Sequence, residues 1–300
     1  MTQKKALVTG ATGYIGSRLV RGLLRNNWEV HCIARKNSSV NYLQDVLHRI
    51  TIYSHDGSSK NMLEIMSKAM PRTVFHLASC VRVEHDEGDI LPLIESNLLF
   101  GTQLVEAMVK TEVFQLINTG TSWQHYENEA YNPVCLYAAT KQAFESIMKY
   151  YVEATPLKAI NLKLYDTYGP DDGRNKLFTL LRYALKSGQP LNLSPGEQLV
   201  NIVYIDDVIE GYLQAEMRLK RTTSNIEEFA LGAKSLIKLK ELVRVYSQVM
   251  DVEPPIVWGG RAYRRREVMV PWSTGRILPD WEPQIDLETG IKRMEQMERK

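Results

Sequence analysis

Residues 5–16 read Lys-Ala-Leu-Val-Thr-Gly-Ala-Thr-Gly-Tyr-Ile-Gly, an apolar run that passes directly into three evenly spaced glycines. A helix-forming segment follows, so the order is strand, glycine turn and helix. A dinucleotide pyrophosphate requires this order: Gly10 permits the tight turn, Gly13 lets the backbone approach phosphate oxygens, and Gly16 lets helix and strand pack closely. The helix N-terminus adds free N–H groups and a partial positive charge. The predicted cofactor contacts in this segment are Gly10, Thr12, Gly13, Tyr14, Ile15 and Gly16.

Outward from this turn, short apolar runs alternate with segments of helical periodicity. Strands are predicted at 5–9, 29–34, 50–54, 73–78, 113–118, 158–165 and 229–232. Helices are predicted at 14–26, 61–70, 89–110, 136–154, 175–187, 206–220 (with Asp206 as its N-cap), 239–250 and 287–297. The alternation indicates an α/β, Rossmann-type doubly wound parallel sheet. We expect residues 1–165 and 200–235 to form the nucleotide-binding domain, and residues 166–199 and 236–300 to form a smaller substrate-binding lobe.

The end of the second strand indicates which nicotinamide cofactor is bound. An acidic side chain there accepts hydrogen bonds from the ribose 2′-hydroxyl, whereas a cation suits the 2′-phosphate of NADP. The strand ends in Arg35 and Lys36, and Arg18 lies early in the first helix. We therefore expect NADP(H) rather than NAD(H), although the same cations also fit a solvated surface. Asp56, after the third strand, is the predicted adenine contact, with a plain turn residue as the alternative, and Gly57 beside it is a predicted cofactor contact.

Tyr137 and Lys141 form the candidate acid–base pair. Their spacing of four residues on a predicted helix places both on one face. An adjacent ammonium stabilises a phenolate, so we expect the pKa of Tyr137 to fall and its proton to exchange with a sugar carbonyl or hydroxyl. A hydroxyl must also orient the substrate oxygen at the end of the fifth strand. Thr121 is the predicted catalytic hydroxyl, with Thr119 and Ser122 as alternatives.

Bulk composition excludes several classes of protein. The chain has 300 residues, with 37 Lys plus Arg against 35 Asp plus Glu, so no overall charge attracts nucleic acid or an anionic membrane. No segment approaches the roughly 20 apolar residues of a membrane-spanning helix. The cysteines, three in all, suit neither a disulfide framework nor a zinc site. We expect a cytoplasmic protein that binds no metal.

Together these residues resemble the extended short-chain dehydrogenase/reductase family, the NAD-dependent epimerases and dehydratases. The matching segments span nearly the whole chain: 9–16, 76–78, Asn97, Tyr137 with Lys141, 168–170, 204–208 and 281–291. The resemblance implies that Asn97 supports the active-site helix and that Lys141 holds the nicotinamide ribose. It implies further cofactor contacts at Leu77, Ala78, Ser79, Asn97, Thr119 and Tyr165. It also implies a homodimer built from helices 89–110 and 136–154 of each subunit.

Within that family, segments 118–125 and 136–142 are similar to the CDP-abequose and CDP-paratose synthase type, which reduces the C4 ketone of a CDP-4-keto-dideoxyhexose in O-antigen-type biosynthesis. Sugars linked to dTDP or GDP are alternative substrates. The family's dehydratases have an Asp-Glu pair where Ser122 and Trp123 stand, and its 3,5-epimerising members have a cysteine near Trp123. These departures leave simple reduction or 4-epimerisation with tightly held NAD. A binding protein that senses NADP without chemistry is a third alternative.

The late loops supply most of the candidate substrate contacts. Arg174 and Lys176 suit a diphosphate, because guanidinium and ammonium groups donate to phosphate oxygens. Arg264 belongs to the basic run 261–266, which is either a diphosphate clamp or a solvated charged face. For His85, a surface loop is the simpler interpretation. The predicted substrate contacts are His85, Ser122, Trp123, Thr167, Arg174, Lys176, Gln198, Asn201 and Arg264.

Overall fold

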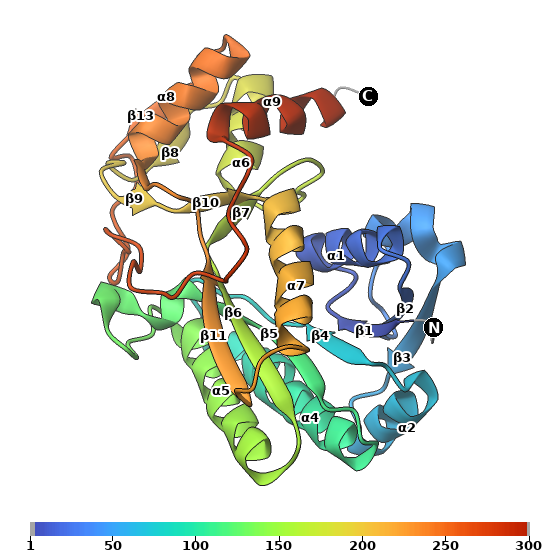
Figure 1. The fold of residues 1–300 in the computed structure, drawn as a ribbon. Helices are drawn as coiled ribbons and strands as arrows, with labels where there is room; N and C mark the ends of the chain where they lie inside the picture. The colour runs from blue at the N-terminus through green and yellow to red at the C-terminus, as the bar shows by residue number, and fades with distance from the viewer. Residues whose placement is uncertain (1–3, 299–300) are drawn as a thin grey trace.

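The computed structural model describes residues 4–298 and contains one seven-stranded sheet with the strand order β11-β6-β5-β4-β1-β2-β3 (Figure 1). Every neighbouring pair is parallel. The strand order reverses between β1 and β4, and such a switch leaves a crevice at the carboxyl ends of the strands. The predicted Rossmann-type fold is confirmed. The strands are β1 (Lys5–Thr9), β2 (Glu29–Arg35), β3 (Ile50–His55), β4 (Thr73–His76), β5 (Gln115–Thr121), β6 (Lys158–Leu164) and β11 (Ile226–Leu231).

Helices cover both faces of the sheet, with α2, α4 and α5 on one face and α1 with α7 on the other (Figure 1). In β1, Ala6 and Val8 join one hydrophobic core and Leu7 joins the other. Strands buried on both faces have no polar side to show, which explains the unbroken apolar runs in the sequence. The covering helices are α1 (Tyr14–Arg25), α2 (Ser59–Ala69), α4 (Phe100–Lys110), α5 (Leu136–Ala154) and α7 (Ile205–Leu219).

The smaller lobe lies beyond the carboxyl ends of the strands (Figure 1). It contains three two-stranded sheets, formed by β7 with β10, β8 with β13, and β9 with β12. Because β7 follows β6 directly, the chain passes from the large sheet into the lobe beside the predicted site. The elements are β7 (Asp166–Tyr168), α6 (Leu177–Ser187), β8 (Leu191–Leu193), β9 (Leu199–Val200), β10 (Ile202–Tyr204), β12 (Ile237–Lys238), α8 (Leu239–Met250), β13 (Ile256–Trp258) and α9 (Leu287–Glu298).

The predicted helix at 89–110 is wrong in detail, because it is not continuous. It consists of α3 (Glu87–Ile94), one π-helical turn η2 (Glu95–Leu99), and α4. The π turn adds a residue to the local turn and directs Asn97, which is 1% exposed, into the protein. Such turns are frequent at functional sites.

Other boundaries also differ from the predictions. Asp206 is not the N-cap of α7: the cap is Tyr204, because the buried Ile205 already begins the helix. Asp206 lies in the first turn instead, where its charge suits the helix dipole. The fifth strand runs to Thr121 rather than to residue 118, because its pairing with β6 continues that far. The 3-10 helix η1 (Asn41–Arg49) was not predicted.

Candidate active site

The glycine turn is shaped by contacts that leave little room for side chains. Gly10 has a φ of 69°, and a Cβ there would lie 2.7 Å from the Ala78 backbone nitrogen. A Cβ on Gly16 would lie 2.1 Å from the Gly10 carbonyl oxygen. On the exposed Gly13, a Cβ would meet only that same oxygen, at 3.4 Å. The first and third glycines therefore form the turn, and the outer side of the second is open to a ligand.

The start of α1 fits an anionic ligand at this open side. Its N-cap is Gly13, no side chain caps it, and no acidic residue lies in its first turn. The partial positive charge of the helix terminus is therefore not compensated by the chain itself. Thr12 and Ile15 flank the cap and are half-buried. This arrangement fits the pyrophosphate of a nicotinamide dinucleotide.

Thr9 ties the ends of β1 and β4 together. Its hydroxyl accepts hydrogen bonds from the backbone N–H groups of Leu77 and Ala78, both at 3.1 Å, and lies 2.8 Å from His76 Nδ1. Burial holds the pKa of His76 well below its usual value, so the imidazole is neutral. These bonds place the segment that leads into Ser79 beside the glycine turn.

The phenol of Tyr137 lies among hydroxyl groups. The side chains of Ser79, which follows β4, and Thr121, which ends β5, lie beside it and favour its ionised form. Burial raises the pKa of Tyr137, Cys135 adds to the rise, and the hydroxyls of Ser79 and Thr121 oppose it. The expectation of a lowered pKa is therefore wrong in this structure, because desolvation outweighs the neighbouring groups. The phenol holds its proton at neutral pH.

Lys141 lies one turn further along α5 and is 1% exposed. Desolvation lowers the pKa of its ammonium from 10.5 to about 8, while the charge of Glu145 raises it and that of Lys163 lowers it. The lysine is therefore charged at neutral pH but titrates not far above it. Glu145 and Lys163 were not singled out in the sequence, although Glu145 follows Lys141 by four residues.

The structure separates the three hydroxyls at the end of β5. The hydroxyl of Thr119 lies 2.7 Å from that of Tyr212 on α7. Thr121 contacts the Tyr137 phenol, as described above. Ser122 is buried and begins a 3-10 turn directly after the strand. We therefore propose Thr121 as the hydroxyl that orients the substrate oxygen.

Asn97, in the π turn η2, joins the two halves of the site. Its amide nitrogen donates to the Cys80 carbonyl oxygen and to the Thr140 hydroxyl, both at 2.9 Å. Its oxygen accepts from the Cys80 N–H at 2.8 Å and from the Ser79 hydroxyl at 3.0 Å. Thr140 belongs to the turn of α5 that carries the acid–base pair. These bonds are the basis on which we propose that Asn97 supports the active-site helix.

The cations predicted to contact a 2′-phosphate differ in their surroundings. Arg35 and Lys36 follow one another at the end of β2 with exposed side chains. Arg18 instead donates to the Pro170 carbonyl oxygen at 2.7 Å and pairs with Asp171 at 2.6 Å. Because its charge is already compensated, Arg18 is the weaker candidate for this contact.

The predicted adenine contact, Asp56, and the predicted cofactor contact beside it, Gly57, lie on the surface after β3. The Asp56 carboxylate accepts a hydrogen bond from the Ser58 N–H at 2.8 Å. The Gly57 carbonyl oxygen accepts from the Gln103 amide, also at 2.8 Å. Both residues are exposed, so a ligand can reach them.

The two cations expected to meet a diphosphate are paired with carboxylates close to them in the sequence. Arg174 binds Asp172 at 2.7 Å and donates to the carbonyl and hydroxyl oxygens of Thr167, both at 3.1 Å. Lys176 binds Asp166 at 2.7 Å. Binding a diphosphate therefore requires these cations to exchange carboxylate partners for phosphate, and that role stays a prediction.

Arg264 brings the basic run of the lobe to the catalytic side of the molecule. It pairs with Glu267 at 2.8 Å, and its guanidinium carbon lies 5.6 Å from the centroid of the Trp123 ring. Its charge opposes the rise that burial causes in the pKa of Cys135 and contributes to the lowered pKa of Asp166, which places it near both. The guanidinium thus lies between the lobe and the segment that leads into α5.

The remaining predicted contacts hold the lobe together or lie on the surface. His85 is exposed, in the segment before α3. Three others are engaged in hydrogen bonds within the protein: Gln198 with Ser194 at 2.9 Å, Asn201 with the Ala233 N–H at 2.7 Å, and Tyr165 with the Trp272 carbonyl oxygen at 2.6 Å. Their contact with a ligand stays a prediction.

Comparison with known proteins decides the family. Residues 6–226 match the NAD dependent epimerase/dehydratase family. The chain belongs to this family. The resemblance inferred from the glycine turn and the Tyr137–Lys141 pair is therefore confirmed.

Relatives within the epimerase/dehydratase family align over nearly the full chain. The CDP-abequose synthase of Salmonella muenchen is 25% identical over 296 residues, which cover 97% of this chain and 97% of the relative. The CDP-abequose synthase of Yersinia pseudotuberculosis is 28% identical over 268 residues, 89% of this chain and 91% of the relative. A solved structure of the UDP-glucuronic acid 4-epimerase of Bacillus cereus, in complex with UDP-glucuronic acid and NAD, has a TM-score of 0.84 at 22% identity, covering 98% of this chain and 99% of that one.

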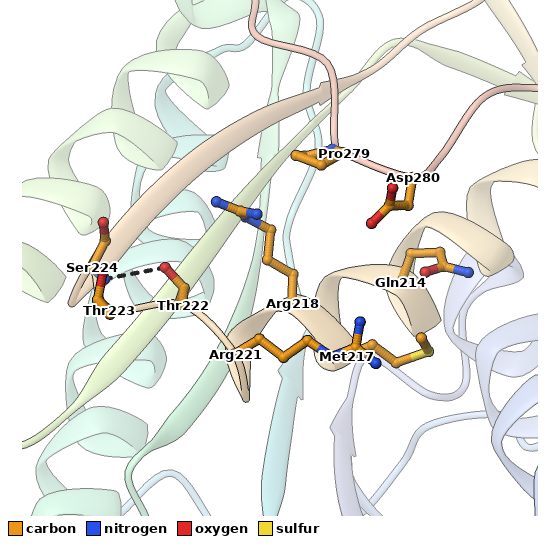
Figure 2. Close-up of a pocket in the computed structure, with 9 residues that line it drawn as sticks. All are labelled: Gln214, Met217, Arg218, Arg221, Thr222, Thr223, Ser224, Pro279 and Asp280. Carbon is orange, nitrogen blue, oxygen red and sulfur yellow. Dashed lines mark hydrogen bonds between the residues drawn. The ribbon is translucent and has the colours of Figure 1, made fainter.

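This family member also has a cavity of about 290 Å³ at the edge of the sheet where β11 begins (Figure 2). Its Arg218 is held by Glu227 at 2.6 Å, so that charge is compensated. Because parallel strands all end at the opposite edge, the cavity lies away from Tyr137. The lining residues are Gln214, Met217, Arg218, Arg221, Thr222, Thr223, Ser224, Pro279 and Asp280.

Residues 4–298 contain no group of three or more His, Cys, Asp or Glu side chains arranged to hold a metal ion. Within the same range, none of the helices is both long and apolar enough to cross a membrane. Cys32, Cys80 and Cys135 are free thiols. Burial raises the pKa of Cys32 to about 12, which leaves it unreactive as a nucleophile.

Proposed function

We propose that this chain uses NAD(P)H to reduce the C4 ketone of a nucleoside-diphosphate 4-keto-deoxyhexose. The observation that carries the proposal is the meeting of the Tyr137 phenol with the hydroxyls of Thr121 and Ser79, beside a turn that fits a dinucleotide. The likeness to CDP-abequose synthases over nearly the full chain supports the class of substrate and favours a CDP-linked sugar. Sugars linked to dTDP or GDP are the alternatives.

The side chains around the phenol fit the proton transfer in this reaction. The bound nicotinamide supplies a hydride to the sugar C4. Thr121 donates a hydrogen bond to the ketone oxygen and holds it beside Tyr137. As the C=O π electrons move onto that oxygen, Tyr137 gives it a proton, and the products are a C4 alcohol and an oxidised nicotinamide. The ammonium of Lys141 stabilises the phenolate until solvent returns the proton.

We propose NADPH as the preferred reductant. The exposed cations Arg35 and Lys36, at the end of β2, suit a 2′-phosphate. An acidic residue in their place would instead accept hydrogen bonds from a free 2′-hydroxyl. The structurally similar 4-epimerase from Bacillus cereus is in complex with NAD. The proposed preference for NADPH therefore rests on Arg35 and Lys36 of this chain and not on that likeness.

The proposal predicts that NADPH is consumed in equal amount to the ketone when the purified protein meets CDP-, dTDP- and GDP-linked 4-keto-deoxyhexoses. The loss of nicotinamide absorbance measures the rate, and NADH run in parallel measures the preference. We expect the CDP-linked sugar to react fastest and NADPH to exceed NADH. Turnover without any added reductant would contradict the proposal and indicate 4-epimerisation.

A 4-epimerase is the second candidate, favoured by the likeness in fold to solved 4-epimerases. The same hydroxyl cluster serves it, but the hydride must return to the other face of the sugar. Such an enzyme retains NAD through purification and consumes none. A protein that binds NADP and turns over no keto sugar is instead a sensor, the third alternative.

We also propose a homodimer in which α3, η2 and α5 of one subunit meet those of another. Apolar side chains on these elements are exposed: Ile90 (47%), Leu91 (64%), Ile94 (38%), Leu99 (48%) and Tyr150 (67%). Light scattering should give about twice the 34.4 kDa of the chain. We expect Leu91→Glu to produce a monomer, because a charge in the contact is desolvated without a partner. A monomeric wild-type protein contradicts this assembly.

A further inference from the structure

A buried ion pair joins α5, the helix that carries Tyr137 and Lys141, to the central sheet. Lys163 on β6 is 0% exposed, and its ammonium lies 2.7 and 2.9 Å from the two carboxylate oxygens of Glu145. Glu145 is one turn beyond Lys141 on α5 and is 6% exposed. Glu228 on β11 reaches the same ammonium at 3.1 Å. Desolvation offsets much of the attraction within such a pair, so stability alone explains it poorly.

The ion pair also touches the strand that carries the predicted catalytic hydroxyl. Gly120 faces Lys163 in the pairing of β5 with β6, and it directly precedes Thr121. A Cβ on Gly120 would lie 2.8 Å from Lys163 Cδ and 2.9 Å from a Glu145 oxygen. Gln124 accepts from the Thr121 N–H at 3.0 Å, and its side chain lowers the pKa of Glu145, which places it near that carboxylate. Three elements that carry or flank the site therefore meet at one pair of charges.

We propose that Glu145 and Lys163 are positioning residues, which hold α5 against the sheet and set the charge around Lys141. The inference rests on the proposed function, in which the Lys141 ammonium stabilises a phenolate. Glu145 attracts that ammonium and Lys163 repels it. Removing either charge alone therefore unbalances the surroundings of Lys141, in opposite directions.

The neutral groups near Lys141 do not change the balance of charge between Glu145 and Lys163. His76, from β4, is buried and neutral, because its pKa is held well below the usual value. Tyr137, from the same helix, holds its proton, because burial raises its pKa. Glu228 has a side chain that is 40% exposed and pairs with Lys163. Burial lowers the pKa of Lys141, and the charges of Glu145 and Lys163 are the two that adjust it further, in opposite directions.

The test compares the pKa of Lys141 in the wild type with its pKa in the variants Glu145→Gln and Lys163→Met. We expect an alkaline pKa near 8 in the kcat/KM profile of the wild type. It should fall by about one pH unit in Glu145→Gln and rise by about as much in Lys163→Met. Lys163→Arg keeps the positive charge and is the matched control, in which Lys141 should titrate at the wild-type pH.

A second readout does not depend on turnover. The stability of each variant is compared, across pH, with that of the same variant carrying Lys141→Met, and the difference reports the Lys141 pKa. If no sugar nucleotide is reduced by any form, the proposed function fails, while this titration still tests the ion pair. The two failures are therefore distinguishable.

Opposite shifts in the two variants support the proposal, and an unchanged pKa in Glu145→Gln overturns it. Lys163→Met leaves a buried carboxylate partly unpaired and risks misfolding. The double variant Glu145→Gln with Lys163→Met removes both charges, so its titration should return toward the wild-type pH. A purely structural pair instead lowers stability in all variants and moves no titration.

Discussion

Replacing Tyr137 by phenylalanine is expected to lower kcat/KM by roughly 100- to 10,000-fold, the range that general acid catalysis contributes. In the proposed reaction the phenol, which lies beside Thr121 and Ser79, is the proton donor, and phenylalanine keeps its shape without its proton. Because burial raises the pKa of the phenol, the acid form is already populated at neutral pH, as ketone reduction requires. The rate is measured with whichever keto-sugar nucleotide the wild type reduces.

The loss should be in chemistry rather than in folding or cofactor binding. NADPH affinity, followed by fluorescence, and the unfolding midpoint are both expected to stay near their wild-type values. Tyr183→Phe is the matched control, since Tyr183 lies on α6, outside the site and the proposed dimer contact, and is 68% exposed. A Tyr137→Phe rate within a few-fold of the wild type would remove the acid role from this residue.

The sheet was predictable because its strands are buried on both faces. Runs such as Ala6–Val8 have no polar alternation, and they recur between segments of helical period. The break in helix 89–110 was not predictable, because an apolar periodicity does not record one additional residue in a turn. What requires the π turn is Asn97, whose four bonds reach Ser79, Cys80 and Thr140. Those partners are distant in the sequence.

That Tyr137 and Lys141 lie on one helix could be predicted from their spacing, but the electrostatics of the pair could not. The spacing of Tyr137 and Lys141 predicts two neighbours on one helix face, and from that alone a lowered phenol pKa. Desolvation depends on what the rest of the chain places over the helix, and it reverses the direction. For Lys176 a signal was present, since Asp166 lies nearby in the sequence and pairs with it.

The second large effect is expected from Lys141→Met, which should stabilise the protein at pH 7 while impairing turnover. Folding buries the ammonium and lowers its pKa from 10.5 to about 8. A difference of this size corresponds to as much as roughly 3 kcal/mol of unfolding free energy. Glu145 remains paired with Lys163 in this variant, so the substitution leaves no carboxylate without a partner.

The direction of the stability difference across pH follows from the folded and unfolded pKa values of Lys141. Below pH 8 the folded and unfolded chains both hold the Lys141 proton, and the cost of the buried charge is complete. Between pH 8 and 10.5 the unfolded chain binds more protons, so wild-type stability rises relative to the methionine variant. Urea unfolding from pH 7 to 10.5 should therefore show an advantage for Lys141→Met that shrinks as the pH rises.

The exposed Lys149→Met, on the same helix, should show no such trend. A difference that is independent of pH, or a less stable Lys141→Met at pH 7, would mean that the buried ammonium is fully compensated in the folded protein.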